Sequence, residues 1–214
     1  MTRRPPTVAI IGPDGAGKTS VARQLPDLLP VPARYLYMGW NYGASNVLLP
    51  TSRLVRRRGP KGADGRRTMR GVASRVAAGI KLANLVAEAW YRQIVANRWS
   101  RAGYLVIFDR HFVADFPDSK GRQAGSPLRR VRHAILRHAV PVPAILIYLD
   151  ARPETLLRRK GEGTVESLER QRAAYRTLIA RHRRAAQVSA EAGLVDVSSR
   201  VAAKVMELME ADGG

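Results

Sequence analysis

The chain of 214 residues contains no cysteine. Disulfide bonds, thiolate nucleophiles and thiolate zinc sites are therefore excluded together. Its four histidines show no HExxH pairing, so we also expect no structural zinc.

Long apolar runs are absent as well. No stretch of about 18 apolar residues occurs, and the first residues lead directly into a short apolar run at 7–11. That beginning has neither the apolar core nor the small-residue cleavage site of a secretory signal. We expect a cytoplasmic protein that does not use a membrane.

Acidic residues are scarce: 17 Asp and Glu stand against 37 Lys and Arg, which gives a net charge of +20. Such a field attracts nucleic acid, acidic membrane surfaces and phosphorylated small molecules, and it does not choose among them. Apolar residues make up 45% and charged residues 25%, as in ordinary globular proteins. Length and composition favour one folded domain over residues 1–214.

Apolar runs alternate with segments of helical periodicity. The runs at 7–11, 33–38, 104–108, 144–149 and 194–197 predict five strands, and the segments 18–29, 72–102, 154–160, 165–190 and 201–210 predict helices. This alternation predicts an α/β fold with a five-stranded parallel sheet and helices on both faces. The basic segment 50–71 is typical of a mobile stretch or of an excursion beside the sheet.

The segment between the first predicted strand and the first predicted helix reads GPDGAGKTS and fits the phosphate-loop pattern GxxxxGK[ST]. In such a loop the backbone N–H groups surround phosphate oxygens, the lysine reaches the β- and γ-phosphates, and the threonine holds magnesium. We therefore predict a three-layer P-loop NTPase fold that binds ATP and Mg²⁺. The alternative is a tight turn without a ligand. The predicted nucleotide-binding residues are Gly12, Asp14, Gly15, Ala16, Gly17, Lys18, Thr19 and Ser20, with Lys18 also catalytic and Thr19 a metal ligand.

The loop pattern alone does not separate a kinase from a GTPase or a motor, but the chain lacks an NKxD segment that would read guanine. Asp14 lies inside the loop, where its carboxylate could orient an acceptor hydroxyl or a water beside the γ-phosphate. The alternative role of Asp14 is to cap the loop by hydrogen bonds to its backbone.

Three motifs in order, GPDGAGKTS, YLVIFDRH and YLDARPETLLRRKGE, resemble the thymidylate kinase family and span most of the chain. The resemblance implies transfer of the ATP γ-phosphoryl group to a nucleoside monophosphate similar to dTMP. It implies that Asp109 helps to place magnesium and that Arg110 faces the acceptor's anionic group. It also implies a short lid at about 158–166 with Arg158, Arg159 and Lys160 as its cations, and a homodimer through the long helix. The alternative for Asp109 and Arg110 is an ordinary ion pair at a strand end. The alternative for the three lid cations is a solvated helix face.

The acceptor motifs of that family are missing. The segment 37–43 replaces its REPGG-like element, and 112–118 replaces the segment that follows its DRH triplet. Glu88 stands near the position of an arginine in the family, with Arg92 one turn later. Together with Asp115 and Asp118, they could line a pocket for a hydroxylated or cationic acceptor, since carboxylates accept hydrogen bonds from hydroxyls and amines; exposed salt bridges explain them too.

Aromatic residues could complete such a pocket. Trp40, Tyr42 and Trp90 could stack on a base or a sugar, or belong to the core.

Four hypotheses follow. The first is a nucleoside monophosphate kinase, and the second is a kinase of the same fold that acts on a sugar or another small-molecule hydroxyl. The third is a nucleic-acid-binding ATPase or polynucleotide kinase, suggested by the charge of +20 and by basic clusters at 53–70 and 122–137. The fourth is a regulatory module that binds nucleotide without turnover.

Overall fold

A parallel five-stranded sheet forms the centre of the protein, in the strand order β2-β3-β1-β4-β5. The computed structural model describes residues 5–39, 46–47, 72–114 and 140–211. The prediction of a five-stranded parallel α/β fold is confirmed. The strands are β1 (Thr7–Ile11), β2 (Ala33–Tyr37), β3 (Leu105–Asp109), β4 (Ile145–Asp150) and β5 (Ala185–Ser189).

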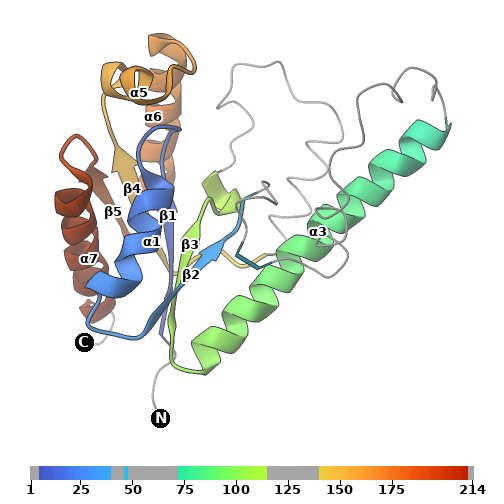
Figure 1. Ribbon diagram of the computed structural model, residues 1–214, viewed down its shortest axis with the longest axis horizontal. Helices are drawn as coiled ribbons and strands as arrows, with labels where there is room; N and C mark the ends of the chain where they lie inside the picture. Colours follow the sequence, from blue (N-terminus) through green and yellow to red (C-terminus); the bar gives the residue numbers. More distant parts are fainter. Residues whose placement is uncertain (1–4, 40–45, 48–71, 115–139, 212–214) are drawn as a thin grey trace.

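Helices cover both faces of the sheet (Figure 1). None of those in the described part of the chain is long and apolar enough to cross a membrane. They are α1 (Lys18–Leu28), α3 (Val72–Arg101), α5 (Pro153–Lys160), α6 (Val165–Ala180) and α7 (Leu194–Glu210), with a short 3₁₀ helix at Phe112–Ala114.

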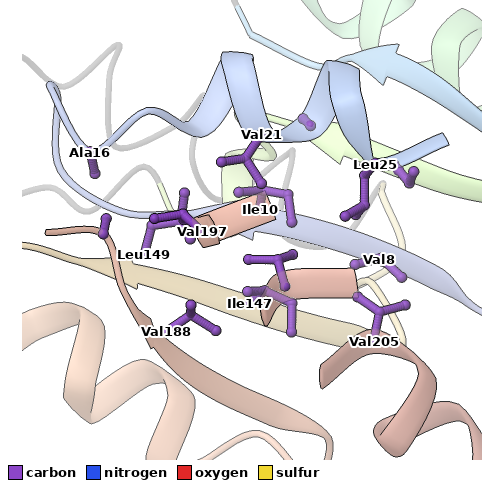
Figure 2. Packing of buried hydrophobic residues seen from close by; sticks show 14 of the residues in the cluster. Val8, Ile10, Ala16, Val21, Leu25, Ile147, Leu149, Val188, Val197 and Val205 are labelled. Carbon is purple, nitrogen blue, oxygen red and sulfur yellow. The ribbon is translucent and has the colours of Figure 1, made fainter. Parts of the chain in front are cut away.

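The central strand β1 supplies both faces of the core by alternation. Val8 and Ile10 point into one cluster, where Figure 2 shows them among side chains of α1 and α7. Ala9 and Ile11 point into the other cluster, which contains residues of α3 and α6. Because a strand buried on both faces has no polar side, its sequence is an uninterrupted apolar run.

Two expectations about the C-terminal third were wrong. The helix predicted over 165–190 ends at Ala180, and residues 185–189 form β5. Alanine favours helices, but pairing of this segment with β4 along the whole strand outweighs that propensity. The strand predicted at 194–197 is the first turn of α7, because Val197, Val201 and Val205 recur every four residues and bury one helical face. The segment 50–71 lies outside the described residues.

Asp150, at the end of β4, fastens α6 to the sheet. Its carboxylate accepts hydrogen bonds from Arg172 Nε at 2.7 Å, from Tyr148 Oη at 2.7 Å and from Gln187 Nε2 at 2.9 Å. Arg176 donates another at 3.1 Å. Burial alone would raise the pKa of Asp150, but these donors hold the pKa below its ordinary value of 3.8.

Replacement of this carboxylate tests its contribution to the fold. Asp150→Asn should lower the free energy of unfolding at pH 7 by about 3 kcal/mol, since it leaves the mostly buried Arg172 with only the more exposed Glu169 as its counter-charge. Because the folded protein favours the ionised form, the native carboxylate loses its contribution as the pH falls below about 3.8. Urea unfolding at pH 7 and pH 3 measures both effects.

The matched control is Glu154→Gln, which makes the same chemical change on an exposed side chain of α5. We expect a change within about 0.5 kcal/mol. Equal losses in the two variants would contradict a special role for Asp150.

Candidate active site

The candidate site lies where β1 and β3 end side by side. These strands pair in parallel with Ile10 opposite Asp109, so the loop that follows β1 begins beside the last residue of β3. The carboxyl edge of a parallel sheet is where such folds bind ligands. Two predicted site segments, 12–20 and 109–110, are therefore brought together.

The phosphate loop depends on its glycines. Gly12 has φ 149°, and a Cβ there would lie 2.6 Å from the carbonyl oxygen of Leu149 on β4. Gly15 and Gly17 also have positive φ, at 92° and 83°, and Gly17 is the N-cap of α1. A chain with these angles can turn its N–H groups toward an anion at the helix start. The loop geometry fits a bound phosphate.

Lys18 is buried within this loop. Its ammonium group donates to the carbonyl oxygen of Pro13 at 2.6 Å and lies 3.5 Å from Oδ1 of Asp14. Burial lowers the pKa of Lys18 to about 8, and the nearby Asp14 carboxylate partly counters this effect. The lysine is thus a desolvated cation beside the loop, and a phosphate there would stabilise its charge.

Asp14 links three segments that are distant in sequence. Its Oδ1 accepts a hydrogen bond from Nη1 of Arg110 at 3.2 Å, and its Oδ2 lies 3.8 Å from the ammonium group of Lys160, at the end of α5. The carboxylate is partly exposed. It therefore stands among three cations, Lys18, Arg110 and Lys160, at the opening of the loop.

Asp109 is fully buried, and its two carboxylate oxygens differ. Oδ2 accepts a hydrogen bond from the hydroxyl of Tyr35 at 3.1 Å, whereas Oδ1 has no hydrogen-bond partner among the residues that the structure describes. A buried carboxylate oxygen of this kind fits a magnesium-bound water. Within the described ranges no cluster of three acidic or histidine residues could hold a metal alone.

Arg110 is the one residue other than glycine with a positive φ, 61°, in the described part of the chain. Such backbone strain is common at functional sites. Arg110 also lines a pocket of about 240 Å³ at the phosphate loop. The pocket is lined by Gly15, Gly17, Lys18, Thr19, Ser20, Arg110, Arg159 and Lys160.

The three predicted lid cations differ in position. Arg159 and Lys160 line the pocket, and Arg159 also donates to the carbonyl oxygen of Ala190 at 2.8 Å. Arg158 is absent from the lining and instead approaches the hydroxyl of Thr155 at 3.5 Å.

Glu191 was not singled out from the sequence. Its carboxylate accepts bonds from the backbone N–H of Arg152 and the hydroxyl of Thr155, at 2.5 and 2.8 Å, and so caps α5, whose N-cap residue offers no side-chain bond. Tyr35 was also missed, because an aromatic at the centre of an edge strand gives no signal until its partner across the sheet is known.

The predicted acceptor residues Glu88 and Arg92 form a buried ion pair on α3, with 3.0 Å between Oε1 and Nη2. Arg92 also donates to the carbonyl oxygen of Gly39 at 2.7 Å, just after β2. Four other predicted acceptor residues lie outside the described residues: Trp40, Tyr42, Asp115 and Asp118. Trp90 is half exposed on α3.

The fold and the loop together define a P-loop α/β protein. Neither a scan against protein-family models nor a search of curated proteins gives a match. Among solved structures, the thymidylate kinase of Candida albicans is similar, with a TM-score of 0.57 and 17% sequence identity. The match covers 98% of this chain and 93% of that one. The chain therefore has a thymidylate kinase-like fold.

The close approach at Gly12 gives a direct test of the loop. Gly12→Ala should weaken ATP binding by about 10- to 100-fold, because a strain of about 1–3 kcal/mol must be relieved by moving the loop. Gly103→Ala is the control: Gly103 also has a positive φ, 89°, but a Cβ there meets nothing within 4 Å. Titration with a fluorescent ATP analogue compares the two variants. Equal ATP affinities of Gly12→Ala and Gly103→Ala would contradict a phosphate-binding role for the loop.

The lowered pKa of Lys18 predicts a pH dependence. ATP affinity should decline as the pH rises through about 8, because the lysine of the free protein then loses its proton and its attraction for phosphate. Isothermal titration from pH 6.5 to pH 9.5 measures this decline. In Lys18→Arg the side chain stays charged, so the variant's affinity should be flat over that range; a parallel decline in both proteins would exclude Lys18 as its source.

Proposed function

We propose that the protein is an ATP- and Mg²⁺-dependent phosphotransferase that moves the γ-phosphoryl group to a nucleoside monophosphate similar to dTMP. The contact of Asp14 with both Lys18 and Arg110 carries the proposal. It joins the group that would bind the donor to the group that would bind the acceptor. The thymidylate kinase-like fold supports the same reading.

Phosphoryl transfer requires positioning and charge stabilisation rather than a covalent enzyme nucleophile. The loop N–H groups and Lys18 would hold the phosphates, and Asp14 would orient the acceptor oxygen. Arg110 would bind the acceptor's anionic group. Thr19 and Asp109 would hold Mg²⁺ or its waters. The bound Mg²⁺ would neutralise charge on the phosphoryl oxygens.

The segment 158–166 would act as the lid of this single domain. It carries Arg159 and Lys160 on the pocket, and Gly161 and Gly163 after them have positive φ of 65° and 95°. Thr164 and Ser167 form a capping box that fixes the start of α6. A short hinge between two well-defined helix ends suits a segment that closes over the γ-phosphate. Arg159 is favoured over Arg158 as the catalytic arginine, because only Arg159 lines the pocket.

A second candidate acceptor is a sugar or another small molecule with a hydroxyl group. The buried pair of Glu88 and Arg92 favours it, since Glu88 neutralises an arginine that donates to Gly39, just after β2. A neutralised arginine attracts an acceptor phosphate less strongly than an arginine without a nearby carboxylate would. The basic clusters that suggest nucleic acid lie outside the described residues, and no observation in the described part favours that function.

An acceptor screen tests the proposal. Purified protein is incubated with ATP and Mg²⁺ and with nucleoside monophosphates, nucleosides, sugars or aminoglycosides, and phosphorylated product is measured. Transfer to dTMP or a related monophosphate is expected, and Lys18→Ala should lower it by about 10²–10³-fold without loss of fold. Transfer only to uncharged acceptors would select the second candidate, and no transfer to any would contradict the phosphotransferase.

Arg110 separates acceptor binding from donor binding. Arg110→Ala should raise the KM for the monophosphate by about 10- to 100-fold, because a charged hydrogen bond contributes about 1.5–3 kcal/mol, and should leave the KM for ATP nearly unchanged. Arg98→Ala, an exposed arginine in the last turn of α3, is the matched control. Unchanged acceptor kinetics in Arg110→Ala would remove this residue from the acceptor site.

A further inference from the structure

Tyr35 makes a contact that the proposed function does not use. Its hydroxyl donates to Oδ2 of Asp109, with 3.1 Å between the oxygens. Tyr35 lies on the edge strand β2, where it pairs with Ile107, two residues before Asp109 on β3. The side chain thus reaches along the sheet to the carboxylate at the strand end.

This hydrogen bond makes the two oxygens of Asp109 unequal. Oδ2 is held by Tyr35, whereas Oδ1 is buried and has no partner among the described residues. Rotation of the carboxylate group would break the bond to Tyr35. The hydroxyl therefore fixes the direction of the oxygen that stays available.

The ring of Tyr35 also lies near α1. The guanidinium carbon of Arg23 lies 5.7 Å from the centre of the Tyr35 ring, and Arg23 follows Thr19 by one turn on the same helix.

We infer that Tyr35 is a positioning residue: by holding Oδ2 of Asp109 it keeps Oδ1 oriented for Mg²⁺ or a Mg²⁺-bound water beside Thr19. The inference rests on the proposed function only in that Mg²⁺ accompanies the nucleotide. Partners that orient a metal-binding group typically change metal affinity or activity by about 10- to 100-fold when they are removed.

The test uses the whole chain with Mn²⁺ as the metal probe. Free Mn²⁺ is measured by electron paramagnetic resonance during titration of protein and ADP, for wild type, Tyr35→Phe and Tyr104→Phe. The last variant removes a hydroxyl from a ring that packs on Arg34, 4.1 Å away, at the amino end of β3. Melting temperatures confirm that all three proteins are folded.

Tyr35→Phe should weaken Mn²⁺ binding by about tenfold or more, while ADP affinity without metal and the Tyr104→Phe control stay at wild-type values. In the transfer assay, saturating Mg²⁺ should restore the kcat of Tyr35→Phe to the wild-type value. Added metal would not correct a merely structural defect. Mn²⁺ affinity within twofold of wild type, or a kcat deficit that persists at saturating Mg²⁺, would overturn the inference. If no acceptor is phosphorylated but Mn²⁺ binding still weakens, the proposed function fails and the role of Tyr35 stands.

Discussion

The parallel pairing of β1 with β3 is the constraint on which the candidate site depends. It sets Ile10 opposite Asp109, so the phosphate loop starts beside the carboxylate and Arg110. Both strands are buried on both faces and fixed by apolar packing, which leaves little freedom at their ends. The packed core therefore fixes the positions of the strand ends that carry the site. The loop between β1 and α1 adds the backbone conformations that only glycine adopts easily.

Charge at the site is balanced around Asp14. Three cations from the loop, from the end of β3 and from the end of α5 lie near one partly exposed carboxylate. The contacts with Arg110 and Lys160 involve partly exposed side chains and are therefore weak, so phosphate oxygens can compete for these two cations. By contrast, Asp150 is surrounded by donors and serves the fold, although both aspartates end or follow strands of the same sheet.

The central fold could be predicted because its signals are local. An apolar run followed by glycines, Lys18 and Thr19 indicates a strand, a phosphate loop and a helix without knowledge of the rest. The last strand could not, because 185–189 is alanine-rich and becomes a strand only by pairing with β4. Likewise, motifs predicted Asp109 and Arg110, whereas Tyr35 and Glu191 matter through partners 74 and 36–39 residues away, which no spacing rule contains.

The central claim is that the phosphate loop, Lys18 and Asp109 together hold a nucleotide with its metal. A crystal structure of the protein with Mg²⁺, ADP and aluminium fluoride tests it most directly. The account predicts the β-phosphate within hydrogen-bond distance of the loop N–H groups and Lys18, with the metal on Thr19 and a metal-bound water on Oδ1 of Asp109. A nucleotide bound elsewhere, or a metal that contacts neither Thr19 nor Asp109 through water, would contradict it.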